Sequence, residues 1–422
     1  MDTFLRHICF WVFLTAFGVS MTAQDSLSVD SVAAETEMPK LDSISISILT
    51  CTPGADLYAK FGHTALRVQD FTLKKDVVFN YGCFNYDSDN FVWKFLLGQT
   101  DYLLAAEPFD FFIYRYEEMG NGVTEQVLNL SQEEANRLLR MLLENLRPEN
   151  QEYRYRWLGV NCTNMVQFQI ERLADEEEGD VIYNWGKEGI YSTTVRDFLH
   201  EKLHQSPWIC FGIDMILGHE IDDWTLMAVN PDSKQRTKLF MPSYFQEVVG
   251  RSTIQDADST QRKYVVMERV LIPATYTEEA PSFFTPMVTF ILLLLLVGGI
   301  SVYDWRRGEV SLWLDVTLAT LQGLAGILVA FLYFYSEHPG VDSNWLVIIF
   351  NPIPLCYAAW MVVCQRRGCR NRLAIVNVAV LAAFLLTMWL CPQVFHPAMY
   401  VVVLILLTRA TIYYLIEKKK TS

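Results

Sequence analysis

The sequence contains no CxxC pair and only seven histidines in 422 residues, so no zinc site is predicted. Basic residues are also scarce, because 34 Lys and Arg stand against 48 Asp and Glu and the formal net charge is −14. Proteins that bind nucleic acids present clustered positive charge, which argues against a nucleic-acid partner. The predicted function requires no metal and no cofactor.

The N-terminus has the pattern of a secretory signal peptide rather than a membrane span. An apolar run over 8–19 follows Arg6, and small residues lead to a predicted signal peptide of 1–23. Residues 24–42 contain no aromatic side chain and are predicted to be a flexible tether. The exported domain is predicted over 43–250, and a linker to the membrane over 251–286.

Five apolar stretches follow residue 286, and two of the loops between them lack lysine and arginine. The stretches are 287–303, 312–335, 345–363, 373–390 and 399–416. The loops SEHPGVDSN and PQVFHPAM hold no basic residue, whereas the other two loops and the tail 417–422 hold arginines or lysines. The positive-inside rule therefore places the exported domain outside and the C-terminal tail in the cytoplasm.

Four cysteines lie in the exported domain, and one of them begins a predicted helix. The four are Cys51, Cys83, Cys162 and Cys210, and the sequence does not decide whether they form two disulfides or stay free thiols. Apolar residues recur at helical spacing after Cys162, and Asn161 is placed to cap that helix. The positive end of a helix dipole favours a thiolate. Cys51 is the rival nucleophile, but it ends a strand before a Pro-Gly turn.

A histidine at the start of a predicted strand supplies a possible general base for such a thiol. His63 begins the alternating segment HTALRVQD, and Asn80 lies on the next predicted strand, where it is a candidate to orient the imidazole. On spacing alone, His63 is more often a structural residue, and Asn80 is more often a turn residue at the end of a strand. Asp214 is an acid among apolar residues, and it is predicted either to cap structure or to support the site.

Several motifs in this order resemble a known group of enzymes. A strand-borne GHTALRV, followed about 100 residues later by an Asn-Cys pair at a helix start, resembles the permuted papain-like acyltransferases such as lecithin:retinol acyltransferase. The segments LTCTPG, FGHTALRV, FNYGCFNYDSDNF, VNCTN and FGIDMILG are similar to the Lnb-type lipoprotein N-acyltransferases of the bacterial envelope. The chain departs from that pattern at Val160 and Met165, where an aspartate and an arginine are expected.

The resemblance implies an α+β fold, with a permuted papain-like exported domain followed by a five-helix transmembrane bundle. It implies transfer of an acyl chain from a phospholipid, through a thioester on Cys162, to the N-terminal amine of a diacylglyceryl-cysteine lipoprotein. His63 would be the base, Asn80 would orient it, and the Cys162 backbone N–H with Asn161 would receive the oxyanion. The implied location is the bacterial inner membrane, with the catalytic domain in the periplasm.

Polar residues and prolines within the apolar region lead to further predictions. Asp315 and Arg409 are predicted to form an ion pair, because unpaired charges inside a membrane are costly. The prolines of FNPIPL, residues 350–355, predict a kink in the third span. His338 and His396 lie in the two loops that lack basic residues, where contact with lipid head groups is possible.

Two other functions stay open from the sequence alone. The same Cys and His would serve a cysteine hydrolase of the cell envelope, such as an amidase, a peptidase or a lipase. A non-catalytic membrane assembly protein is the third alternative. Five spans favour the transferase, because a lipid donor and a lipid-anchored acceptor both reside in the bilayer, whereas a soluble wall substrate needs one anchor at most.

Overall fold

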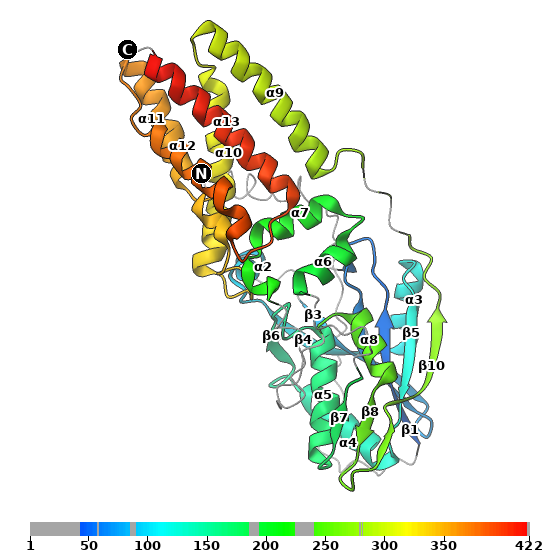
Figure 1. Cartoon of the computed structure of the whole chain (residues 1–422). Coiled ribbons are helices and arrows are strands. Elements are labelled where there is room, and N and C mark those ends of the chain that lie inside the picture. The colour runs from blue at the N-terminus through cyan, green and yellow to red at the C-terminus, as the bar shows by residue number, and fades with distance from the viewer. Residues whose placement is uncertain are drawn as a thin grey trace. The chain divides into compact units, whose positions relative to one another are not determined.

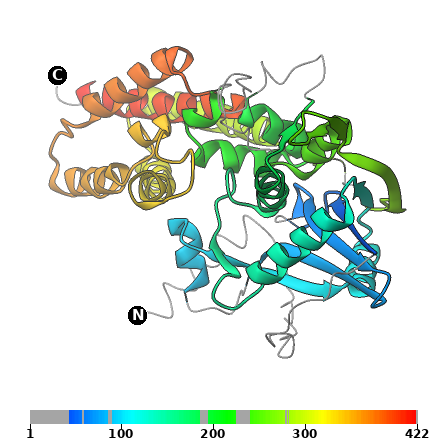
Figure 2. The same cartoon turned by 90° about the horizontal axis from the view of Figure 1, so that it is seen from below.

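The computed structural model describes residues 43–56, 59–84, 90–184, 194–223, 240–277, 280 and 282–419. The predicted signal peptide and tether lie outside these residues. The described chain forms two compact units (Figures 1 and 2). The first, here called the sheet unit, takes residues 43–91, 100–184 and 240–277. The second, the helical unit, takes 92–99, 194–223, 280 and 282–419.

A seven-stranded antiparallel sheet is the framework of the sheet unit. Its strand order is β10-β5-β1-β2-β3-β4-β6. The strands are β1 Ile44–Cys51, β2 His63–Asp70, β3 Lys75–Cys83, β4 Asp101–Pro108, β5 Val123–Leu128, β6 Glu152–Arg154 and β10 Val265–Ile272. A smaller sheet of order β7-β8-β9 joins Asp180–Ile182, Thr253–Gln255 and Gln261–Lys263. The alternating segment HTALRVQD thus forms β2, a central strand of the larger sheet.

Helices cover both faces of the large sheet, so its strands alternate between two cores. The helices α4 Gln132–Asn145, α5 Cys162–Glu176 and α8 Pro242–Arg251 pack on one face, and α3 Phe109–Glu118 packs on the other. Along β1, Ile46 and Ile48 enter the first core, whereas Leu49 and Cys51 enter the second. This is the period of two that the pleat of a strand imposes.

Helix starts in the sheet unit follow from local capping. Ser131 and Glu134 form the reciprocal capping box that begins α4. Asn161 caps α5 through its side-chain oxygen, which accepts from the backbone N–H groups of Thr163 and Asn164, both at 3.0 Å. Cys162 is consequently the first residue of α5, as the spacing of the following apolar residues indicates.

The helical unit contains four helices long and apolar enough to cross a membrane. They are α9 Pro286–Arg307, α10 Leu312–Tyr335, the segment Trp345–Arg367, and α13 Pro397–Lys419. The fifth predicted span, 373–390, is the shorter apolar helix Ala374–Leu390. At ~1.5 Å per residue it spans roughly 25 Å, below the ~30 Å of a bilayer core. The mixed α/β exported domain followed by membrane helices is confirmed, but the count of five is not.

The third span is interrupted at FNPIPL, as the prolines predict. A short 3-10 helix, η5 Trp345–Ile348, is followed by α11 Ile353–Arg367. Gln322 donates to the Ile349 carbonyl at 2.7 Å, and Asn351 accepts from the Ile353 backbone N–H at 3.0 Å. Backbone groups freed by the break therefore find side-chain partners, which is the condition for irregular backbone at membrane depth.

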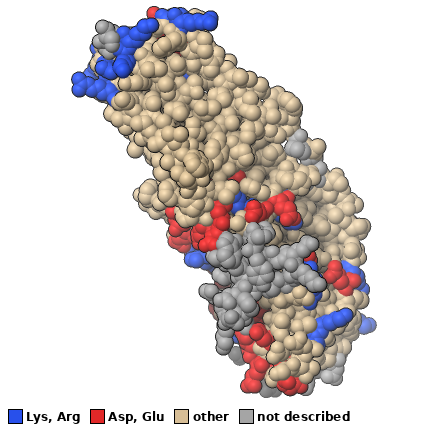
Figure 3. Space-filling view, in the orientation of Figure 1, with Lys and Arg blue, Asp and Glu red and all other residues tan. Residues whose placement is uncertain are grey.

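Charges in the four long apolar helices are confined to one end and to one buried cluster. Lysines and arginines gather at the end of this unit where the loops 306–309 and 366–372 and the end of α13 lie, and the surface beyond them is almost free of charge (Figure 3). Inside, Arg409 contacts Asp315 at 2.6 Å and Asp304 at 3.0 Å. The predicted ion pair is confirmed, with Asp304 as an additional partner.

Residues 194–223 belong to the helical unit, although the exported domain is predicted to extend over 43–250. This segment contains α6 Val195–Leu203, α7 Pro207–Ile216 and the 3-10 helix η3 His219–Asp222. Asn344 donates to the Met215 carbonyl at 2.8 Å, and the Gly218 backbone N–H donates to the Gly340 carbonyl at 2.6 Å. The local sequence pattern of this segment does not reveal those partners.

Candidate active site

Cys162 lies at the N-terminus of α5, and hydrogen bonds of the preceding residue, Asn161, fix its position. The amide group of Asn161 donates to the carbonyls of Trp157 and Phe240, both at 2.9 Å, while its oxygen caps the helix. Both amide hydrogens are therefore used, and this side chain has no donor left for an oxyanion. The backbone N–H of Cys162, as the first of the helix, has no acceptor within the helix.

His63 begins β2 and lies beside Cys162. Each side chain shifts the pKa of the other through its charge and a hydrogen bond. Gly82, on β3, lies against both, because a Cβ added there would be 3.5 Å from the Cys162 Cβ and 3.8 Å from the His63 Cε1. Thr64 and Thr163, the next residues along each element, share a hydrogen bond of 3.1 Å between their hydroxyls. The structure thus brings together the cysteine and histidine that the sequence singled out.

Asn80 contacts the opposite side of the imidazole. Its Oδ1 lies 2.6 Å from the Nε2 of His63. An amide oxygen only accepts hydrogen bonds, so this contact keeps the proton of a neutral imidazole on Nε2. The remaining nitrogen, Nδ1, is then the one that can accept the proton of the Cys162 thiol. Asn80 occupies the place of the third member of a catalytic triad.

Two residues that the sequence analysis did not select hold Asn80 in this orientation. Glu107 on β4 accepts from the Nδ2 of Asn80 at 3.2 Å, and Arg115 on α3 donates to the same carboxylate oxygen at 2.6 Å. A carboxylate cannot donate, so it fixes which end of the amide faces His63. The only signal in the sequence was a lone acid in the apolar stretch YLLAAEPF.

The electrostatics of the pair favour a thiolate next to an imidazolium. Burial would raise the pKa of the Cys162 thiol, but the charge and hydrogen bond of His63, the Thr64 backbone N–H and the Thr163 hydroxyl lower it to about 7. Burial would lower the pKa of His63, but the Cys162 charge and hydrogen bonds to Cys162 and Asn80 raise it. The Cys162 thiol is therefore substantially ionised at neutral pH.

The other thiols of the sheet unit have no such activation. Burial raises the pKa of Cys51 far above its ordinary value, and burial together with Glu107 raises the pKa of Cys83 to about 12. The four cysteines of the predicted exported domain are free thiols. These differences favour Cys162 over the rival Cys51 as the nucleophile.

The pH dependence of alkylation should distinguish these thiols. We expect the rate of Cys162 alkylation by iodoacetamide to rise with pH and to reach half its maximum near pH 7, because only the thiolate reacts. Mass spectrometry of the tryptic peptide 157–172 measures the rate. The same midpoint should move upward in His63→Asn. A midpoint at or above ~8.5 in the unmodified chain, the value of an ordinary thiol, would contradict this account.

Glu107 provides a second test at this site. We expect Glu107→Gln to lower the alkylation rate of Cys162 at pH 7 about fivefold to tenfold, because a glutamine no longer fixes the Asn80 amide, and one hydrogen bond contributes ~1 kcal/mol. Glu118, exposed at the end of α3, gives the control Glu118→Gln. Equal rates in both variants would show that Glu107 does not position Asn80.

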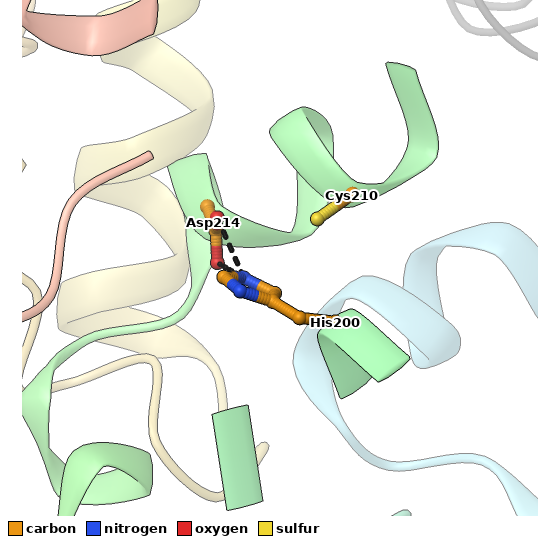
Figure 4. A group of neighbouring side chains, drawn as sticks. All are labelled: His200, Cys210 and Asp214. Atoms are coloured by element: carbon orange, nitrogen blue, oxygen red, sulfur yellow. Dashed lines mark hydrogen bonds and ion pairs between the residues drawn. The ribbon is translucent and has the colours of Figure 1, made fainter. Parts of the chain in front are cut away.

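A second cluster of reactive side chains lies in the helical unit, and it contains Asp214. The ligating atoms of His200, Cys210 and Asp214 lie within 4.8 Å of one another (Figure 4). Residues 200–204 read HEKLH, which matches the HExxH pattern of zinc sites, so the sequence does contain one zinc-site pattern. His204, however, donates from Nδ1 to the Glu201 carbonyl, 2.8 Å away.

Charge balance favours an ion network for this cluster. Arg196 contacts Asp214 at 2.5 Å and Asp222 at 2.6 Å, and His200 lies 2.9 Å from Asp214. The hydrogen bond to Asp214, followed by that to Cys210, raises the pKa of His200 to about 10, so it is a cation at neutral pH. Two cations then balance two carboxylates. The partners of Asp214 lie in its own unit, and its support of the Cys162 site stays a prediction.

The two loop histidines have structural partners. His338 Nε2 lies 2.7 Å from the Phe95 carbonyl. His396 accepts from the Ala398 backbone N–H at 3.1 Å, and its ring packs edge-on against Phe211 at 5.2 Å. Both side chains are half-buried. Head-group contact stays a prediction for both.

The fold and the site define a class of protein, in which an exported mixed α/β domain with a Cys–His pair is joined to membrane-spanning helices. Residues 32–183 match the Lnb N-terminal periplasmic domain, and residues 278–421 match the Lnb transmembrane domain. The chain belongs to the Lnb family, as its motifs predict, and is a bacterial membrane protein with a periplasmic domain. No curated protein and no solved structure matches it.

Proposed function

We propose that this protein is a lipoprotein N-acyltransferase with Cys162 as its nucleophile. It moves a fatty acyl chain from a phospholipid to the N-terminal amine of a diacylglyceryl-cysteine lipoprotein. The observation that carries the proposal is the contact of Cys162 with His63, with Asn80 on the other side of the imidazole, in a periplasmic domain attached to membrane helices. Membership of the Lnb family supports the same reaction class.

In the first half-reaction the sulfur of Cys162 attacks an ester carbonyl of the phospholipid. A carbon–sulfur bond forms and the carbon–oxygen bond to glycerol breaks. His63, which holds the thiol proton on Nδ1, returns it to the departing glycerol oxygen, so a lysophospholipid leaves and a thioester remains. The Cys162 backbone N–H at the helix start is placed to stabilise the oxyanion of the tetrahedral intermediate.

In the second half-reaction the α-amine of the lipoprotein attacks the thioester. An amide bond forms, the carbon–sulfur bond breaks, and His63 accepts the proton that the amine loses. An α-amine has a pKa near ~8, so a useful fraction is neutral at physiological pH. A thiolate with a lowered pKa is a good leaving group, and the pKa of about 7 for Cys162 suits it to both half-reactions.

The charge distribution of the helical unit supports an orientation in the membrane. Arginines and lysines gather at one end of α9, α11 and α13, and the positive-inside rule assigns that end to the cytoplasm. The proposed location is the inner membrane, with the C-terminus in the cytoplasm and the Cys162 domain on the periplasmic side. Both lipid substrates are then within the same leaflet.

The direct test uses the purified full chain in phospholipid vesicles with a synthetic diacylglyceryl lipopeptide. Mass spectrometry should find the lipopeptide heavier by one acyl group, together with one lysophospholipid for each acyl group transferred. Release of free fatty acid without any acylated peptide would assign the protein to the hydrolases instead. Absence of both products would reject catalysis on phospholipids.

A further inference from the structure

The connection between β3 and β4 is much longer than adjacent antiparallel strands require. These strands pair directly, for example Asn80 with Ala105, and a hairpin needs about 2–5 connecting residues. The chain instead leaves the sheet after Cys83 and returns at Asp101, and it forms the helix α2 Phe91–Leu97 between them. Residues 92–99 of this excursion belong to the helical unit. Long connections of this kind usually serve a function.

A row of aromatic rings in the sheet unit extends from the neighbourhood of Cys162 to the first residue of α2. Tyr155 precedes Arg156, whose backbone pairs with Val160, two residues before Cys162. The rings of Tyr155 and Tyr102 stack at 4.1 Å, those of Tyr102 and Phe84 lie 5.0 Å apart, and those of Phe84 and Phe91 stack at 5.5 Å. All four side chains are half-buried, so part of each stays accessible.

The helix that follows Phe91 exposes its apolar side chains. Its sequence is FVWKFLL, and none of its residues is buried. Val92 is 53% exposed and Trp93 54% exposed. A helix on the surface of a water-soluble protein turns its apolar face toward the core. Contiguous exposed apolar residues instead mark a contact with a partner or a membrane.

Contacts within the helical unit fix α2 to the end of α10. Trp93 packs against Phe331, with ring centroids 5.0 Å apart. The Glu337 backbone N–H donates to the Leu97 carbonyl at 2.8 Å, and His338 contacts the Phe95 carbonyl. The close approach requires glycine at 98, because a Cβ there would lie 2.8 Å from the His338 backbone nitrogen. Figures 1 and 2 show α2 beside this end of α10.

The position of Phe331 along α10 sets the depth of α2 in a bilayer. The helix begins at Leu312, shortly after Arg306 and Arg307, and its 24 residues end at Tyr335. At ~1.5 Å per residue it is about 36 Å long, slightly more than a ~30 Å hydrocarbon core. Its end away from the arginines therefore lies at the boundary between acyl chains and head groups, where Trp and Tyr are enriched.

We propose that α2 is immersed in the outer leaflet and that the aromatic row from Phe91 to Tyr155 binds the acyl chain of the phospholipid donor on its way to Cys162. The ligand class is a long saturated or unsaturated acyl chain, which the apolar ring faces accept without hydrogen bonds. The immersion of α2 is independent of the reaction, whereas the acyl-chain role of the row rests on the proposed function.

Photocrosslinking tests the immersion of α2. We place p-benzoyl-phenylalanine at position 92 of the full chain, in vesicles of phosphatidylethanolamine and phosphatidylglycerol, and in parallel at position 266. Val266 is the matched control, because it is the same residue type, 57% exposed, on β10 of the sheet unit. Mass spectrometry should find phospholipid adducts several-fold more often at 92 than at 266. Equal yields at both positions would overturn the immersion of α2.

A comparison between a long-chain and a short-chain acyl donor tests the role of the aromatic row. Tyr102→Ser removes the central ring, and we expect the ratio of Cys162 acylation by a long-chain phospholipid to that by p-nitrophenyl acetate to fall about tenfold. The ratio corrects for any general loss of folding or of nucleophile. An unchanged ratio would overturn the acyl-chain role. If the unmodified chain forms no thioester with the phospholipid, the proposed function and this role both fail, and crosslinking at 92 still decides the immersion of α2.

Discussion

Replacing Cys162 with serine is expected to lower acyl transfer to the lipopeptide by a factor of about a thousand or more. The hydroxyl has the same shape, but it does not ionise near neutral pH, and loss of a nucleophile in comparable enzymes removes nearly all catalysis. The assay in phospholipid vesicles described above measures the rate. Thermal unfolding of the variant shows that the loss does not arise from misfolding.

Cys83→Ser is the matched control for this experiment. Cys83 is a free thiol of the same sheet unit, also half-buried, and its pKa of about 12 keeps it protonated. We expect this variant to retain the activity of the unmodified protein. Transfer that persists in Cys162→Ser, or is lost equally in both variants, would remove the basis for the assignment of the nucleophile.

Loss of Arg409 should strongly destabilise the helical unit. This residue is 2% exposed and lies between Asp304 and Asp315, so Arg409→Met leaves two buried carboxylates without a counter-charge. Breaking a buried ion pair in this way costs about 3–5 kcal/mol. Thermal unfolding in detergent micelles should show a large decrease in Tm relative to the unmodified chain.

Two further variants make that prediction specific. Arg307→Met removes an exposed arginine whose partner is Glu309, and we expect no measurable change in Tm. Adding Asp315→Asn to Arg409→Met should recover part of the lost stability, because it removes one uncompensated carboxylate. A double variant less stable than Arg409→Met would show that charge compensation is not the role of Arg409.

The active-site elements that depend on local sequence were predictable. Cys162 begins a helix because Asn161 caps it and apolar residues follow at helical spacing, and His63 begins a strand because HTALRVQD alternates. The pairing of β2 with β3 then places Asn80 near His63. Each of these features can be read from a stretch of fewer than 20 residues, since Asn80 lies 17 residues after His63.

Glu107 and α2 were not predictable in the same way. Glu107 reaches Asn80 only because β4 pairs with β3 after the chain has left the sheet and returned, and no local pattern encodes that register. The membership of α2 and of residues 194–223 in the helical unit depends on packing partners more than a hundred residues away. The count of five spans is not confirmed, because Ala374–Leu390 is shorter than the four helices that meet the length of a span, and hydropathy alone does not show helix length.

The central claim is that an acyl group resides on one sulfur during the reaction, and this intermediate can be observed. The full chain is incubated with phospholipid vesicles and no acceptor, quenched in acid and digested with trypsin. The account predicts that the peptide 157–172 gains the mass of one fatty acyl chain, and that neutral hydroxylamine removes it, as expected for a thioester. An acyl adduct on a peptide other than 157–172, or none at all while a lipopeptide is still acylated, would contradict it.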